Sequence, residues 1–336
     1  MPGVDVFVPC YQYGAYLEEC AKSVLTQQVP ELRLLIIDNA STDGSPEIAQ
    51  RIAAADDRVT VYLNEQNRGV HDSRNRAIDW ARADYFVILD ADDVLTEGAL
   101  ARGIAFLDQH PEVSFLYGVE GRLTGGLLDQ GRCDAKTTRW NVVSGGEFIA
   151  RTCWDSFCDI GAPAVIVRTA TQKAAGYYRE SLARTCDFEM YLRLAMLGDV
   201  ANTNRVSGIR RIHEAQLSNP YHLDPIRDFE EHEAAFGSFF AHEGRVLSNA
   251  EVLQSMSRRK MGDYVYWYAM AQRLRGRAGV SAAMDFAAAR RALPAWLPPL
   301  TFLLKKRWLR SLWRAGRRVR YAPTPLPSSY SVPSYL

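Results

Sequence analysis

The chain has 336 residues, enough for one large domain or two domains of ordinary size. Hydrophobic residues make up 47% of it and charged residues 24%, the composition of a soluble globular protein. The net charge of +1 argues against a nucleic-acid partner, but the charge is uneven: the first 285 residues carry 30 basic and 39 acidic groups, and the remainder carries ten basic groups and no acidic one.

Strands alternate with helices through residue 107. Four short apolar runs that end at polar residues are typical of buried strands, and they occupy residues 4–8, 34–37, 59–63 and 85–89. Between the first two runs, apolar side chains of residues 17–25 recur at helical spacing, which predicts a helix packed on the sheet by one face. This alternation predicts βαβ units, a mostly parallel sheet and therefore an α/β fold.

The second part of the chain is less regular. Residues 118–160 are rich in glycine and predict long loops with at most a short hairpin; loops of this length are often functional. A strand at 164–168, a helix from Asp187 to Gly198 and a strand at 208–212 are expected to follow. From about residue 224 the pattern is wholly helical, and the last fifteen residues, rich in Pro, Ser and Tyr, are expected to be disordered.

Polar side chains follow three of the predicted strands, in the segments Pro9-Cys-Tyr11, Asp38-Asn39 and Asp90-Ala91-Asp92. Because the carboxyl ends of parallel strands share one edge of a sheet, these segments are expected to form a single site. The glycine-rich dinucleotide-binding fingerprint is absent after the first strand, and no P-loop occurs in the chain. A nicotinamide-dinucleotide domain and a P-loop enzyme are therefore excluded.

The acidic segment after the fourth strand admits two interpretations. Asp90 and Asp92, with only the small Ala91 between them, could both reach one hard cation, and two carboxylates with substrate phosphates are a usual way of holding Mg²⁺. Alternatively, the segment is a solvated acidic turn in which Asp93 or Thr96 caps the next helix. The residues alone favour neither interpretation.

Six motifs occur in an order and spacing that are typical of one enzyme family. They are Phe-Val8-Pro-Cys-Tyr11, Ile-Ile-Asp38-Asn-Ala-Ser-Thr-Asp-Gly-Ser45, Asn67-Arg-Gly followed by Arg74-Asn75, Val-Ile-Leu-Asp90-Ala-Asp92-Asp, Cys-Asp187-Phe-Glu-Met-Tyr-Leu-Arg193 and Arg211-Ile-His213. Through them, residues 3–220 resemble the family-2 inverting glycosyltransferases. The resemblance implies the GT-A fold, a Rossmann-like, mostly parallel sheet with flanking helices, here followed by a C-terminal helical region. It also favours the metal site over the solvated turn.

The resemblance assigns eight residues to the binding of a nucleoside-diphosphate sugar: Pro9, Tyr11, Asp38, Asn39, Arg74, Asp90, Ala91 and Asp92. Tyr11 would pack on the nucleoside base and Asp38 would hydrogen-bond to it, while Arg74 would lie near the ribose or the diphosphate. Asp90 and Asp92 would be the acids of the DxD motif, which binds Mn²⁺ or Mg²⁺ and, through the cation, the diphosphate.

Asp187 would be the catalytic base, and His213 a further metal or phosphate ligand. On the residues alone, Asp187 would equally serve as the N-cap of its helix, Glu189 would interact with the helix dipole, and His213 would be an ordinary packed histidine. The chain departs from the family pattern at two positions. Asn39 stands where a second acid is common, and Cys186 stands before the base where the family often has Glu.

These assignments predict a metal-dependent, inverting transfer of a sugar from a nucleoside-diphosphate sugar, preferably a UDP-sugar, to an acceptor hydroxyl. The cation would stabilise charge on the leaving diphosphate, and Asp187 would take the proton of the attacking hydroxyl. The acceptor would be a carbohydrate or a lipid-linked sugar in cell-surface polysaccharide or glycoconjugate synthesis. The alternatives are a nucleotidyltransferase, which usually has a basic glycine-rich loop that this chain lacks, and a non-catalytic sugar-binding protein, which would not need all three acids.

The predicted organisation has three parts. Residues 1–220 form the catalytic domain, with a nucleotide-sugar-binding half at about 1–110 and an acceptor half at about 111–220. Residues 221–293 form a helical appendage. Residues 294–336 form a basic amphipathic segment and a disordered tail.

Within the last part, residues 304–320 place tryptophan and leucine beside a cationic face. They are expected either to contact the surface of an anionic membrane or to pack on the acidic body of the protein. The six cysteines show no paired framework, no signal peptide precedes the first strand, and no apolar segment reaches the ~20 residues of a membrane span. These features predict a cytoplasmic protein, at the inner face of the membrane if residues 304–320 bind lipid.

Overall fold

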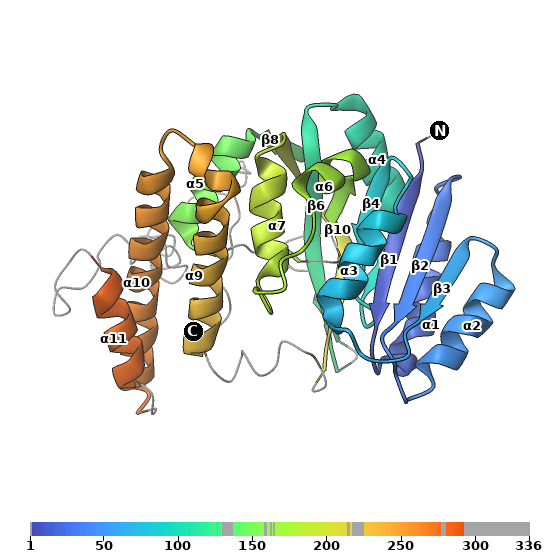
Figure 1. Ribbon diagram of the computed structural model, residues 1–336, viewed down its shortest axis with the longest axis horizontal. Helices are drawn as coiled ribbons and strands as arrows, with labels where there is room; N and C mark the ends of the chain where they lie inside the picture. The colour runs from blue at the N-terminus through green and yellow to red at the C-terminus, as the bar shows by residue number, and fades with distance from the viewer. Residues whose placement is uncertain are drawn as a thin grey trace, which may run out of the picture. The chain divides into compact units, whose positions relative to one another are not determined.

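The computed structural model describes residues 2–125, 127–129, 137–157, 160, 161, 163, 165–213, 216, 225–276 and 280–291. The described residues fall into two compact units. The sheet unit lies within residues 1–149 and 160–217, and the helical unit lies within residues 150–159 and 218–336. Figure 1 labels elements of both units, although β5, β7 and β9 carry no label there.

The strands are β1 (Val4–Cys10), β2 (Leu32–Asp38), β3 (Val59–Leu63), β4 (Tyr85–Ile88), β5 (Val94–Leu95), β6 (Val113–Thr124), β7 (Leu127–Asp129), β8 (Trp140–Val143), β9 (Val165–Arg168) and β10 (Asp199–Ile212). The α-helices are α1 (Gly14–Leu25), α2 (Ser45–Ala55), α3 (Gly69–Trp80), α4 (Ala99–Gln109), α5 (Gly145–Asp155), α6 (Thr169–Ala175), α7 (Cys186–Ala195), α9 (Pro225–Ala241), α10 (Ala250–Leu274) and α11 (Val280–Arg290). A 3₁₀-helix spans Glu243–Val246.

Strands β3, β2, β1 and β4 are neighbours in that order and all parallel, as the sequence predicts (Figure 1). The apolar runs of β1 and β2 are almost completely buried, because both faces of this part of the sheet are covered. Helix α1 buries its predicted apolar face, which includes Leu17 and Val24, in the core formed with these strands. The expected βαβ arrangement is therefore confirmed.

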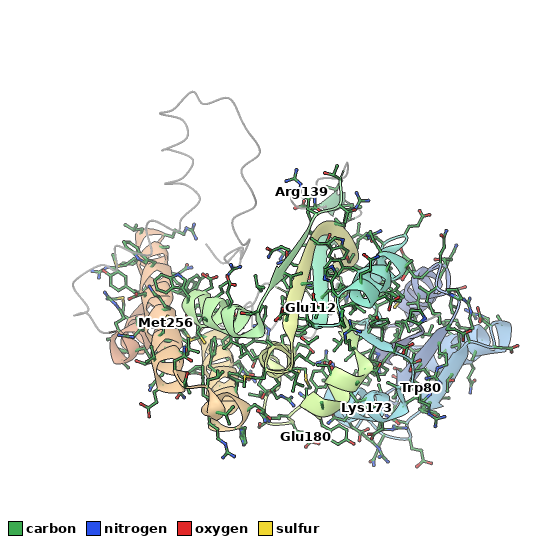
Figure 2. The ribbon with its side chains drawn as sticks, turned by 90° about the horizontal axis from the view of Figure 1, so that it is seen from above. Trp80, Glu112, Arg139, Lys173, Glu180 and Met256 are labelled. Atoms are coloured by element: carbon green, nitrogen blue, oxygen red, sulfur yellow. The ribbon has the colours of Figure 1, made fainter. Side chains whose placement is uncertain are left out.

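The amino ends of β1 and β2 are joined by an ion pair between a buried acid and a partly exposed arginine. Asp5 is fully buried, and the Arg33 side chain donates to both of its carboxylate oxygens, at 2.8 and 2.6 Å. The backbone N–H groups of Arg82 and Ala83 donate to the same carboxylate. The Arg33 guanidinium lies 4.5 Å from the ring centroid of Trp80, which Figure 2 labels at the end of α3. Both carboxylate oxygens of Asp5 therefore accept hydrogen bonds from the protein, and we assign this acid a structural role.

Beyond β4 the sheet is mixed. The order continues β9, β6, β10 and β5, with β9 antiparallel to both of its neighbours and β10 parallel to β6 but antiparallel to β5 and β8. The parallel character predicted from the sequence is thus concentrated in β3, β2, β1 and β4.

Within 118–160 the predicted short hairpin is confirmed, but the prediction of long loops is wrong for the described residues. β6 continues to Thr124 and forms a hairpin with β7, and β8 and α5 follow within the same segment. Its glycines mark close contacts between elements: a Cβ atom on Gly118 would lie 2.0 Å from the Ser207 side-chain oxygen, and one on Gly145 would lie 1.7 Å from the Ala195 carbonyl oxygen. Gly118 allows β10 to approach β6, and Gly145 allows the end of α7 to approach the start of α5. In the sequence, glycines that serve such close packing look the same as glycines in loops.

The helical unit confirms the helical pattern predicted beyond residue 224. Phe229, Phe236 and Phe239 of α9 are buried, and Phe229 makes an edge-to-face contact with Tyr264 of α10. Glu233 of α9 is paired with Arg290 of α11 at 2.5 Å. An aromatic core with an ion pair joins the described helices of this unit.

Two predicted features lie outside the described residues: the basic segment and tail at 294–336, and within it the proposed membrane contact at 304–320. Among the helices that are described, none combines the length and the hydrophobicity needed to cross a membrane.

Candidate active site

The carboxyl ends of β1, β2 and β4 meet at one edge of the sheet, as predicted. Cys10 at the end of β1 lies opposite Asp38 at the end of β2, and the Asn39 N–H donates to the Cys10 carbonyl at 2.8 Å. On the other side of β1, the Leu89 N–H donates to the Phe7 carbonyl at 2.9 Å, which carries the chain to the acidic segment at the same edge. All three polar segments therefore belong to one region of the sheet unit.

The acidic segment is a tight turn closed by a hydrogen bond from the Asp93 N–H to the Asp90 carbonyl, at 2.9 Å. Ala91 is completely buried and Asp92 is 6% exposed, whereas the side chain of Asp90 is 38% exposed. Partial burial raises the pKa of Asp90 to about 6; the Arg74 charge opposes this shift, and the negative charges of Asp92 and Asp187 reinforce it. The turn thus concentrates negative charge that a cation would neutralise.

The end of β10 packs against this turn. His213 Nε2 lies 3.0 Å from Asp92 Oδ2, and the imidazole ring packs on Tyr16 with 4.9 Å between ring centroids. Arg211 binds the turn from the same strand end: its N–H donates to Asp93 Oδ1 at 3.0 Å, and its Nε donates to the Asp92 carbonyl at 3.1 Å. His213 and Asp92 are therefore neighbours, although 121 positions separate them in the sequence.

The residues of this turn fit a hard divalent cation. The Asp90 side chain is 38% exposed, Asp92 lies two positions further on, and an imidazole stands beside Asp92. Among the described residues, however, no three His, Cys, Asp or Glu side chains come close enough together to hold an ion by themselves. The protein thus offers part of a coordination shell, and phosphate oxygens are the usual ligands that complete such a shell.

The other end of the edge carries the predicted nucleoside-binding residues. Pro9 is the penultimate residue of β1, and Tyr11, directly after the strand, is 41% exposed. Asp38 is only 1% exposed; its Oδ2 accepts a hydrogen bond from the Ser41 N–H at 2.9 Å, whereas its Oδ1 is buried without a partner among the described residues. A buried acceptor without a donor is unusual, and it fits a ligand that supplies an N–H group.

The Asn39 side chain is hydrogen-bonded within the protein. Its side chain is buried and donates to Asn67 Oδ1 at 2.7 Å, and its own Oδ1 accepts from the Asn64 side chain at 3.0 Å and from the Arg68 N–H at 2.9 Å. The amide therefore holds the loop between β3 and α3, and a contact of Asn39 with the nucleotide stays a prediction.

The loops after β1 and β2 are joined to each other. The Gln12 side chain donates to Thr42 Oγ1 at 3.0 Å, the Gln12 N–H donates to Ser41 Oγ at 2.9 Å, and the Gly14 N–H donates to Asp43 Oδ2 at 2.9 Å. These bonds hold Gln12 at a left-handed φ of 61°, which a residue with a side chain seldom adopts. The surroundings of Tyr11 and Asp38 are thus rigidly built.

Asp187 lies in the first turn of α7, and its side chain is 26% exposed. The helix begins at Cys186 with Thr185 as its N-cap, so the interpretation of Asp187 as the cap is wrong. Glu189 also lies in the first turn, as the helix-dipole interpretation requires, and in addition it is fully buried and paired with Arg193 and Arg179. Asp187 is thus the acid of this turn that faces outward.

Arg74 of α3 joins the two acidic regions. Its Nη1 lies 3.1 Å from Asp187 Oδ1, and its Nη2 lies 3.8 Å from Asp90 Oδ1. Nη1 also donates to Cys186 Sγ at 2.9 Å, and the guanidinium carbon lies 5.3 Å from the centroid of the Tyr178 ring. The sequence gave no sign of Tyr178. The resemblance implies a place for Arg74 near the ribose or the diphosphate, and in the structure its guanidinium lies between Asp187 and Asp90.

Three comparisons with known proteins bear on the family and the fold. A family model described as Glycosyl transferase family 2 matches residues 5–173. TuaG of Bacillus subtilis, named for teichuronic acid biosynthesis, is 35% identical over 106 residues, which are 32% of this chain and 42% of TuaG. The chain spans less than half the length of the first curated relatives that it matches.

Two solved structures share the fold. S. aureus TarS, residues 1–349 in complex with UDP-GlcNAc, has a TM-score of 0.55 at 18% identity, with 96% of this chain and 94% of that chain covered. The mannosyltransferase PcManGT of Pyrobaculum calidifontis, in complex with GDP-Man and Mn²⁺, has a TM-score of 0.54 at 20% identity, with 94% and 81% covered. The architecture is thus the GT-A fold that the motifs imply. The family model matches half of the chain, and the protein therefore belongs to glycosyl transferase family 2.

Proposed function

We propose that the protein is a metal-dependent, inverting glycosyltransferase that moves a sugar from a UDP-sugar to an acceptor hydroxyl. The observation that carries this proposal is the separation of two acidic groups around one arginine. Asp90 and Asp92 stand at the edge of the sheet, Asp187 stands on α7, and Arg74 bridges the two places. A single displacement needs such a division, with one acid for the acceptor and others for the cation.

The donor site is the edge formed by β1, β2 and β4. The unpaired Oδ1 of Asp38 would accept a hydrogen bond from the N–H of a uracil ring, and the exposed ring of Tyr11 would pack on the base. The ligands named for the two solved relatives, UDP-GlcNAc and GDP-Man with Mn²⁺, support a nucleoside diphosphate and a divalent cation. Uridine is the base that we propose here.

The residues of this chain would act in the following way. Asp90 and Asp92 would hold the cation, with His213 beside it as a further ligand or as a partner that orients Asp92. The cation supplies positive charge at the leaving diphosphate. Asp187 would accept the proton of the acceptor hydroxyl through its Oδ2, because its Oδ1 is engaged by Arg74. Attack from the side opposite the diphosphate inverts the anomeric centre.

We further propose a carbohydrate or a lipid-linked sugar as the acceptor, in the synthesis of a cell-surface polysaccharide; the name of TuaG supports this class. The donor half would comprise residues 1–110 and the acceptor half residues 111–220, with residues 221–293 as a helical appendage. Contact of residues 304–320 with a membrane stays a prediction from the sequence.

The proposal is tested by incubating the full chain with a panel of labelled nucleoside-diphosphate sugars, Mn²⁺ and candidate glycan or lipid-linked acceptors. We expect release of nucleoside diphosphate together with transfer of label, both abolished by EDTA and restored by added Mn²⁺. Formation of a nucleoside triphosphate and sugar 1-phosphate when pyrophosphate is added would indicate a nucleotidyltransferase, and binding without turnover would indicate a sugar-binding protein. Either result would overturn the proposal.

The incomplete metal shell leads to a prediction about binding. Because the described acids need further ligands to hold an ion, Mn²⁺ and UDP should each raise the affinity for the other, by roughly 5–150-fold. Isothermal titration of UDP in the presence of Mn²⁺ or EDTA measures this coupling. Uridine, which lacks phosphates, is the matched control, and its affinity should not depend on Mn²⁺. Equal UDP affinity with and without Mn²⁺ would contradict the shared site.

A further inference from the structure

Arg74 contacts Asp187 and Asp90 and is more buried than either acid. Its side chain is 6% exposed, whereas those of Asp187 and Asp90 are 26% and 38% exposed. The guanidinium is therefore more deeply placed than either carboxylate to which it is bound. Nη1 is shared by Asp187 and Cys186, Nη2 lies 3.8 Å from Asp90 Oδ1, and the buried Nε has no partner among the described residues, so the shortest contact of the guanidinium with an acid is the one with Asp187.

The position of Arg74 is held by the next residue along the chain. The Asn75 side chain donates to the Tyr178 carbonyl at 3.1 Å and accepts from the Tyr178 N–H at 2.7 Å, which fixes the Tyr178 ring against Arg74. Arg193 supports the same loop by donating to the Ala175 and Tyr177 carbonyls. Figure 2 labels Glu180, an exposed residue of this loop. The arginine is thus held in a rigid niche.

The charge of Arg74 is maintained by its partners. Burial alone would lower the pKa of Arg74, but the negative charge of Asp187, followed by the influence of Cys186 and Asp90, raises this pKa well above its ordinary value. A permanent positive charge at this place offsets part of the repulsion between Asp187 and the acids of the turn.

Asp187 depends on this one partner. Within the described part of the chain, Arg74 is the only cation within 4 Å of the Asp187 carboxylate. Asp187 also borders a cavity of about 20 Å³, whose described lining is mainly apolar and includes Gln172 and Tyr178 but no charged side chain other than Asp187. No second charged group is therefore available there to fix the direction of the carboxylate.

We infer that Arg74 is a positioning residue for Asp187: it engages Oδ1, leaves Oδ2 directed at the acceptor, and fixes the distance between Asp187 and Asp90 without contacting the donor. This inference rests on the proposed function, in which Asp187 is the base. It replaces the role near the ribose or diphosphate that the resemblance implies. An acid that must meet a hydroxyl in a defined geometry is sensitive to displacement by as little as 1 Å.

The test is a double-mutant cycle that combines Arg74→Met with Asp187→Asn. Arg74→Met should lower kcat by about 10²-fold at saturating donor, and should leave the Kd of UDP with Mn²⁺ within about threefold of the wild-type value. In the Asp187→Asn background, Arg74→Met should cause almost no further loss, because both changes remove the same function. Arg74→Lys should recover part of kcat, since it keeps the charge but loses the fork of donors.

The matched control is Arg33→Met, which breaks the ion pair with Asp5 at the opposite edge of the sheet. It should lower the melting temperature and leave kcat unchanged, which separates a loss of stability from a loss of positioning. If Arg74→Met shows no cooperative melting transition, Arg74→Lys takes its place in the cycle, with a smaller loss of kcat that should again vanish in the Asp187→Asn background.

Two results would overturn the inference. One is a tenfold or greater rise in the Kd of UDP for either Arg74 variant with kcat unchanged at saturating donor, which would make Arg74 a donor ligand. The other is full additivity in the cycle, which would show that Arg74 acts independently of Asp187. Failure of the proposed function is recognised separately, because it would appear in the wild-type protein alone. If the wild-type protein turns over no donor, the proposed function is overturned, and the inference that rests on it is overturned as well.

Discussion

Asp187→Asn is expected to lower kcat by about 10²–10⁴-fold, the usual contribution of a general base. Asparagine has nearly the same shape and can still accept a hydrogen bond from Arg74, but its amide cannot take up a proton at neutral pH. Because Asp187 is not the N-cap of α7, the exchange removes no capping bond and the helix should be preserved. Initial rates at saturating donor, with circular dichroism of both proteins, measure these expectations.

The binding of UDP distinguishes this effect from damage to the donor site. The Kd of UDP with Mn²⁺ should stay close to the wild-type value, since Asp187 stands on α7 and the donor residues stand on the sheet edge. Asp79→Asn is the matched control: this exposed acid of α3 accepts a hydrogen bond from the Tyr177 hydroxyl and should tolerate the change. A kcat for Asp187→Asn within a few-fold of wild type would show that another group is the base.

Asp92→Asn is expected to cause a loss of comparable size through a different step. Removing one of two carboxylates should weaken the cation site and take away several kcal/mol of stabilisation of the leaving diphosphate; about 4 kcal/mol corresponds to a rate loss of about 10³-fold. The same change should abolish the increase in UDP affinity that Mn²⁺ causes. Asp90→Asn should behave similarly, because the two acids are proposed to share the ion.

Asp93 provides the control within the same turn. It is buried, and its Oδ1 accepts from the Arg211 N–H, a bond that asparagine can also make. Asp93→Asn should therefore keep the coupling between Mn²⁺ and UDP, which titration of UDP with and without the ion would measure. If Asp93→Asn lost this coupling while Asp92→Asn kept it, the assignment of the metal-binding acids would be wrong.

The features that the sequence predicted correctly are those set by local pattern. Apolar runs that end in polar residues identified β1, β2, β3 and β4, and the rule for parallel strands brought Asp38 and Asp90 to one edge. The helices of α9 and α10 followed from periodicity in the same way. These signals lie within a few residues of each other, so a single sequence is sufficient to detect them.

The features that could not be predicted from the sequence depend on contacts between segments that are distant in the chain. Glycines such as Gly118 indicated loops, although they are needed because β10 lies close to β6. The buried pairing of Glu189 with Arg179 and Arg193 could not be distinguished from a surface charge. Likewise, nothing near Arg74 in the sequence indicates that Asp187 is its partner, because 113 positions separate the two residues. Charged side chains reveal their partners only when the fold is known.

The most direct test of the proposed chemistry is a real-time NMR measurement of the reaction. The full chain, at high concentration with Mn²⁺ and a UDP-α-sugar that supports turnover, would be followed by ¹H and ³¹P spectra with and without an acceptor. We predict that UDP appears in step with a β-configured sugar, formed by one displacement at the anomeric carbon and visible before any mutarotation. A product that retains the α configuration, or cleavage between the two phosphates to give UMP, would contradict the single displacement in which Asp187 is the base.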